Sequence, residues 1–343
     1  MARLWVDQGH LVGVIEEAPP FWFSFSVAGS RKSPPSIVDR CISKAARHVS
    51  PYDRAEAKAI NVFLHMGEDG PNDVIPEGNV LEWMRGAQVR KKRRIAALWH
   101  LFYLLARYLP AEARETPSVT AEAVEDIVRP MVDGLIQPDW REVALRELGR
   151  RVFVLDHDTT MAAMKAEIST GWIGEAWRVF WLYFEDYGLA PRGLKLAMDG
   201  VSAGTFAHVR PSARKKADPY CDVVGHEAAH LLHYLKPENF ELSVRRGQER
   251  FLDVRFDSRE LFAFACEAFS QVLKAGDRKA RLAFAERMRE DATSFPKNGR
   301  KRFSELVLAA TRSRNGWKVI RETVVEKRRS RSQPGKLSLE AKS

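Results

Sequence analysis

The sequence predicts an α+β protein in which a mostly helical N-terminal region precedes a domain with a small mixed sheet. Helical hydrophobic patterns dominate residues 36–135, whereas the buried strand-like runs lie beyond residue 150. Hydrophobic residues make up 45% and charged residues 29% of the 343 residues, as in an ordinary globular chain. This composition argues against a wholly disordered chain, a collagen-like repeat and a membrane bundle.

The length is sufficient for two domains. We expect a mostly helical region of unknown role at residues 1–140 and the sheet-containing domain at residues 141–325. Residues 326–343 have almost no apolar content and are expected to form a basic, disordered tail.

In the N-terminal region, aromatic residues alternate with small or polar ones over residues 21–27, which predicts a strand. Helices are expected over residues 53–65 and 79–109, separated by a loop rich in Gly, Pro, Asn and Asp at residues 67–78. A further helix should begin near Thr120, and Pro130 should kink or end it.

In the second domain, the apolar run at 152–155 predicts a buried strand. The three residues that follow it, Asp156, His157 and Asp158, are of types that can bind metal, but they match no known ligand spacing. We therefore expect them to form a loop or the end of the strand. Aromatic residues at helical spacing predict a core helix over 172–187. Strands 194–198 and 205–209 are expected to form a hairpin with DGVSAG as its turn. A helix is expected to start at Asp218 and Pro219 and to end near Lys236. Another should run from 257 or 258 to about Gly276, followed by more helix to about 325.

The net charge of +10 comes from two short basic runs. Residues 90–94 (RKKRR) contribute +5, and residues 327–343 contribute another +5, so the rest of the chain is balanced. Because Arg90–Arg94 falls within an expected helix, a solvated helix face is the preferred interpretation. Either run is also suited to an acidic partner or to nucleic acid.

The sequence suggests a cytoplasmic protein without a membrane span. The three cysteines cannot form a disulfide framework, and the first residues lack a signal-peptide pattern. The longest apolar stretch, at 96–106, is too short to cross a bilayer.

The strongest chemical signal is the segment 223–232, VVGHEAAHLL. On a helix, His226 and His230 lie one turn apart on the same face, so both imidazoles can reach one zinc ion. Glu227 lies at the edge of that face, from which its carboxylate can act as a general base on a water molecule.

This segment resembles the extended HExxH pattern of the zincin metallopeptidases. The resemblance rests on aliphatic Val223 three residues before the first histidine, on uncharged residues between the histidines, and on Leu231 and Leu232 after the second. It implies a zincin-like domain with a Zn²⁺ cofactor and a protein or peptide substrate. It also implies that the strand before the motif helix, residues 205–209, binds an extended substrate by edge pairing.

A catalytic zinc needs a third protein ligand. The sequence after His230 lacks the glycine and third histidine of the metzincin pattern, whereas Glu260-Leu-Phe-Ala is similar to the glutamate helix of gluzincins, in particular of IrrE/ImmA-like and lethal-factor-type peptidase domains. The resemblance implies that Glu260 is the ligand. Spacing leaves two alternatives: Glu267 is the ligand, or Glu260 only caps its helix with Asp257. The glutamate that is not the ligand could orient a histidine.

His233 shares a helix face with His226 but lies about 10 Å along the axis, so one ion cannot easily bind both. We expect His233 to be a packed histidine or one that hydrogen-bonds to a ligand, with direct metal binding as the alternative. These residues favour a zinc metallopeptidase, a hydrolase in which a zinc-activated water attacks a peptide carbonyl with Glu227 as the base. The alternative is a nucleic-acid-associated regulator with a structural or catalytically silent zinc site.

Overall fold

The computed structural model describes residues 3–7, 10–15, 36–67, 80–115, 119–196, 198–203, 205–215, 218–244, 248–291 and 300–325. The strand expected at 21–27 and the tail expected at 326–343 lie outside these residues. Two compact units divide the chain: residues 1–109 with 187–198, and residues 110–186 with 199–343.

The first unit contains an antiparallel hairpin and a group of three helices. Its elements are β1 (Arg3–Asp7), β2 (His10–Ile15), α1 (Ile37–Val49), α2 (Arg54–Met66), α3 (Val80–Leu105) and the short helix η1 (Ala106–Tyr108). Ser36 and Asp39 form a capping box that starts α1, and Gly67 ends α2 in a left-handed conformation with φ of 72°.

The basic run 90–94 lies within α3, as its helical pattern predicts. Arg93 forms an ion pair with Glu56 of α2. Arg94 is buried, with its guanidinium carbon 5.6 Å from the centre of the Phe63 ring. Arg93 and Arg94 of this run therefore contribute to the packing of the unit.

The second unit contains a three-stranded sheet and the remaining helices. Its elements are α4 (Ala111–Glu115), α5 (Ala121–Leu135), η2 (Pro138–Trp140), α6 (Arg141–Arg151), β3 (Val152–Val154), α7 (His157–Ser169), α8 (Ile173–Asp186), β4 (Gly200–Ala203), β5 (Phe206–Val209), η3 (Pro211–Lys215), α9 (Val223–Leu232), η4 (Pro237–Phe240), η5 (Phe256–Ser258), α10 (Arg259–Lys274), α11 (Arg278–Asp291), α12 (Arg300–Arg312) and α13 (Gly316–Val324). The described chain is thus mostly helical with a small mixed sheet.

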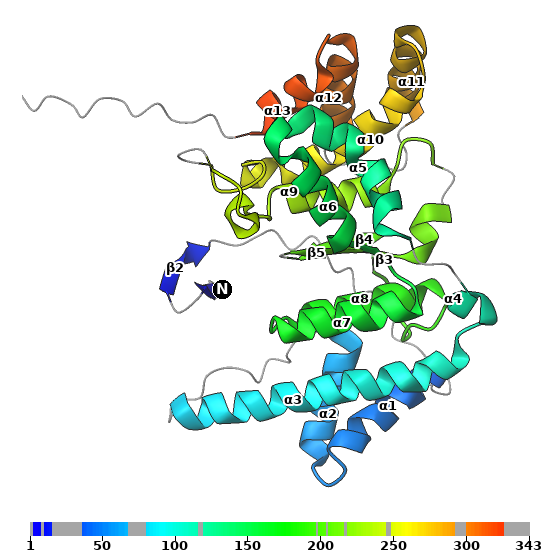
Figure 1. Ribbon diagram of the computed structural model, residues 1–343. Helices are drawn as coiled ribbons and strands as arrows, with labels where there is room; N and C mark the ends of the chain where they lie inside the picture. The colour runs from blue at the N-terminus through cyan, green and yellow to red at the C-terminus, as the bar shows by residue number, and fades with distance from the viewer. Residues whose placement is uncertain are drawn as a thin grey trace, which may run out of the picture. The chain divides into compact units, whose positions relative to one another are not determined.

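The sheet has the order β3-β5-β4, with β3 parallel and β4 antiparallel to β5. Figure 1 shows α9 on one face of the sheet and α7 and α8 on the other. Ala207 and Val209 of β5 enter the core shared with α9, α10 and α5, while His208 between them forms a buried contact with Glu167 of α7. This layering places α9 between the sheet and α10.

Residues Ile173–Asp186 of the aromatic segment form α8, and most of its large side chains are buried, although Trp172 just before the helix is 51% exposed. The fully buried ones are Trp177, Phe180, Trp181, Tyr183 and Phe184. No helix in the described residues combines the length and apolar character needed to cross a membrane.

The position predicted for the first hairpin strand was wrong. The expected strand was 194–198, but β4 is Gly200–Ala203, inside the segment assigned to the turn. Gly200 and Ser202 are small because this face of β4 lies against α9, and small residues in a strand permit such close approach. A composition that normally marks a turn therefore forms a strand here.

The expectation that residues 205–209 act as an edge strand was also wrong. β5 pairs with β3 on one side and with β4 on the other, so both of its backbone edges are occupied within the unit. Among the described strands, β4 has only one partner. In this sheet the outer strands are β3 and β4, so a further extended segment could pair with either of them but not with β5.

Several helix boundaries also differ from the expectations. α9 is capped by Asp222, not Asp218, and ends at Leu232 rather than near Lys236. α5 continues through Pro130 to Leu135, held by its packing against α6 and α9. Asp156 begins a helix, α7, through a capping box with Thr159, where a loop or strand end was expected.

Candidate metal centre

The helix α9 presents His226 and His230 on one face. The carboxylate of Asp222 accepts a hydrogen bond from the Gly225 amide at 3.3 Å and so fixes the start of this helix. One turn of helix separates the two imidazoles, and their Nε2 atoms lie 3.2 Å apart. Two ring nitrogens at that distance can bind the same ion.

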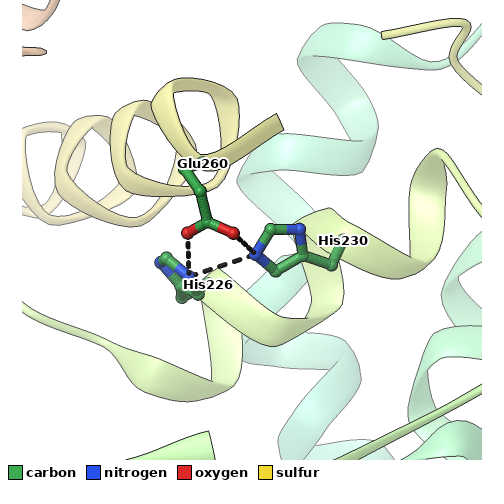
Figure 2. A group of neighbouring side chains, drawn as sticks. All are labelled: His226, His230 and Glu260. Atoms are coloured by element: carbon green, nitrogen blue, oxygen red, sulfur yellow. Dashed lines mark hydrogen bonds and ion pairs between the residues drawn. The ribbon is translucent and has the colours of Figure 1, made fainter. Parts of the chain in front are cut away.

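Glu260, at the start of α10, completes the group (Figure 2). Its Oε2 lies 3.8 Å from Nε2 of His226, and its Oε1 lies 3.6 Å from Nε2 of His230. Ligand atoms on a tetrahedral zinc ion, each about 2.0–2.1 Å from the metal, are about 3.3 Å apart. The three donors are thus arranged as a candidate His₂Glu metal site.

The donor set has a buried side and an open side. The histidine side chains are 12% and 9% exposed, whereas that of Glu260 is 55% exposed. A three-ligand set with an open side leaves a further coordination position for water or another ligand. Two imidazoles and a carboxylate fit a divalent transition-metal ion.

Glu267 lies on the far side of the His226 ring from Glu260. Its Oε2 is 3.1 Å from Nδ1 of His226, and its Oε1 accepts a hydrogen bond from the Asp222 amide at 2.6 Å. A carboxylate at Nδ1 holds the proton there and leaves the lone pair of Nε2 directed at the metal position. Glu267 therefore lies where it orients a ligand, not where it joins the His₂Glu group.

This contact also sets the charge of His226. Burial alone would lower the pKa of its imidazole, but the hydrogen bond and negative charge of Glu267 raise that pKa to about 9. The ring of Phe264 packs edge-on against the imidazole, with ring centres 4.6 Å apart. His226 is therefore held in one orientation, and an ion that binds at Nε2 has to displace a proton.

His233 supports the second histidine in the same way. Its Nε2 lies 3.1 Å from Nδ1 of His230, and burial lowers its pKa to about 3, so its ring is neutral at physiological pH. A neutral His233 can accept the Nδ1 proton of His230, which leaves the Nε2 of His230 free for a metal. The sequence suggested that His233 is either simply packed or in contact with a metal-binding histidine, and the structure shows the contact with His230.

Glu227 is buried between α9 and β4. A Cβ atom added at Gly200 would lie 2.7 Å from Oε1 of Glu227, so the absence of a side chain at Gly200 makes room for the carboxylate. Burial raises the pKa of Glu227 to about 7, although the positive charge of His226 and a hydrogen bond from Ser202 oppose the rise. A carboxyl with a pKa near 7 can both accept and donate a proton at neutral pH.

The sequence did not single out several residues of this environment. Gly200 and Ser202 were assigned to a turn, and Asp222 was passed over in favour of Asp218. The Asp222 carboxylate also accepts a hydrogen bond from Gln271 at 3.1 Å. An Asp three residues before Gly225 could have been found as a helix cap.

Comparisons of the chain with models of known protein families, with curated proteins and with solved structures gave no match. The residues of the centre therefore carry the functional argument themselves.

Proposed function

We propose that the protein is a zinc metallopeptidase of the gluzincin type, which hydrolyses peptide bonds of a protein or peptide substrate, in the cytoplasm. The observation that carries this proposal is the His₂Glu group with the buried carboxylate of Glu227 next to His226. His226, His230 and Glu260 would hold the zinc ion. When bound, zinc lowers the pKa of water towards about 7 and polarises a carbonyl group.

The chain supplies the proton transfers. Glu227 accepts a proton from the attacking water, and its pKa of about 7 lets it return that proton to the departing amine. Glu267 and His233 keep the protons of the two histidines on Nδ1, so that both Nε2 atoms face the zinc position.

We further propose that β4 aligns the substrate. Its Gly200–Ala203 segment lies beside Glu227 and has one strand partner among the described strands. An extended peptide paired with the free edge of β4 would place its backbone along the strand that packs against Glu227. This role replaces the one that the resemblance implied for residues 205–209.

The test compares the zinc-loaded protein with a Glu227→Gln variant on a peptide library, with cleavage products identified by mass spectrometry. The amide has the shape of the carboxylate but cannot accept the proton. We expect cleavage to fall by at least about 10²-fold while the zinc content is unchanged. Equal cleavage by the two proteins would overturn the proposal.

A further inference from the structure

Arg259 is held between two aromatic rings at the edge of the metal centre. Its guanidinium carbon lies 5.5 Å from the centre of the Tyr234 ring and 4.9 Å from that of Phe256. The Phe256 side of this arrangement is open, because Phe256 is 71% exposed. The rings fix the direction of the guanidinium without neutralising its charge.

No acidic side chain among the described residues lies within ion-pair distance of Arg259, although its Nε is buried and has no hydrogen-bond partner. The nearby Arg255 shows the contrast. Its guanidinium lies 3.6 Å from the Asp257 carboxylate and donates to Ser258 and to the carbonyl of Thr323. The Nε of Arg255 also has no hydrogen-bond partner, so the two arginines differ in charge pairing alone. Arg255 has an acidic partner, whereas Arg259 hydrogen-bonds to the neutral side chain of Tyr234 and has no acidic partner among the described residues.

The location of Arg259 is unfavourable for a cation. It is the first residue of α10, where the helix dipole favours acidic side chains. It directly precedes Glu260, a member of the candidate metal site. Both the helix dipole and a cation bound nearby would disfavour the positive charge of Arg259, which has no acidic partner to offset them. Residues that break such local preferences are commonly functional.

We propose that the Arg259 guanidinium binds a carboxylate of the substrate, so that the peptides cleaved at this centre carry an acidic side chain or a free C-terminus near the scissile bond. A carboxylate would supply the missing partner and can accept two parallel hydrogen bonds from the guanidinium. This inference rests on the proposed function and adds the substrate class to it.

Binding of matched small probes to the zinc-loaded protein separates the two proposals. The probes are hydroxamates, which bind zinc, joined through two, three or four methylenes to either a carboxylate or a primary carboxamide. Isothermal titration calorimetry in carboxylate-free buffer gives each affinity. We expect the best carboxylate probe to bind at least about tenfold more tightly than its carboxamide match.

Variants locate the source of that preference. In Arg259→Gln the two probes should bind equally, and Arg259→Lys should keep part of the preference because the charge remains. The control Arg289→Gln removes an exposed charge from α11 and should leave the preference unchanged. Equal binding of both probes to the unmodified protein would overturn the role of Arg259, while failure of every probe to bind would count against the zinc centre itself.

Digestion of a peptide library then identifies which carboxylate is bound. Enrichment of Asp or Glu beside the cleaved bonds indicates an acidic side chain. Release of C-terminal residues from peptides with a free carboxylate, but not from their amides, indicates the main-chain carboxylate. Either preference should disappear in Arg259→Gln, and cleavage without either preference would contradict the inference.

Discussion

The carboxylate of Glu267 lies 3.1 Å from Nδ1 of His226, on the opposite side of the ring from the Nε2 that faces Glu260. One oxygen of Glu267 accepts from the imidazole while the other accepts from the Asp222 amide. A glutamine at this position keeps only one acceptor and loses the negative charge. This contact therefore links the start of α9 to the orientation of a candidate metal ligand.

We expect Glu267→Gln to weaken zinc binding by about 10–100-fold, the usual cost of losing a group that orients a ligand. Glu260→Gln should weaken it more, because it changes a ligand. Competition with a fluorescent zinc chelator measures both affinities. A larger loss in the Glu267 variant than in the Glu260 variant would exchange the two roles.

Glu260 and Glu267 show which part of the candidate site the sequence could predict. His226, Glu227 and His230 belong to one helix, so local spacing alone predicts that they share a site. Glu260 and Glu267 come from α10, and both lie on the side of that helix that meets α9. Their assignment depends on how the two helices pack, which the spacing within one helix does not determine.

His233 offers a second test of the ligand supports. His233→Phe keeps the ring but removes the acceptor for Nδ1 of His230, so we expect about tenfold weaker zinc binding. His233→Gln retains a side-chain oxygen that can accept the same proton and should recover part of the affinity. The same chelator competition applies, and identical affinities in all three proteins would rule out a role for this contact.

Gly200 is expected to be required for the position of Glu227. Gly200→Ala places a methyl carbon 2.7 Å from both Oε1 and Cγ of Glu227, which is closer than van der Waals contact, so the carboxylate has to move. We expect peptide cleavage to fall by about tenfold or more with unchanged zinc content. Gly86→Ala on α3, where the added atom meets only the end of the flexible Arg90 side chain, serves as the control and should cleave peptides normally.

The position of β4 marks a limit of sequence reasoning. The segment DGVSAG has the composition of a turn, and nothing local distinguishes it from one. Gly200 is small because Glu227 needs the space, and this reason becomes visible only when α9 lies against the strand. The start of α7 is a similar case, because Asp156 can cap a helix or end a strand equally well.

Glu175 provides a prediction on stability. Burial raises the pKa of this carboxyl, with a contribution from Glu167, and Arg178 and His208 only partly oppose the rise. A raised pKa means that the charged form is less favourable in the folded than in the unfolded state, so ionised Glu175 costs stability at neutral pH. Glu175→Gln should therefore increase the free energy of unfolding at neutral pH.

That gain should shrink as the pH falls through the raised pKa of Glu175 and should level off below about pH 4.5, where Glu175 is protonated in both states. Urea unfolding of both proteins at several pH values measures the difference. A gain that is independent of pH would mean that charge burial is not its cause.

The metal content of the purified protein tests the central claim most directly. Inductively coupled plasma mass spectrometry on the unmodified protein and on His226→Ala, His230→Ala and Glu260→Ala gives the number of bound ions per chain. The account predicts one zinc ion in the unmodified protein and a marked loss in each variant. A metal-free unmodified protein, or full zinc occupancy in all three variants, would contradict it.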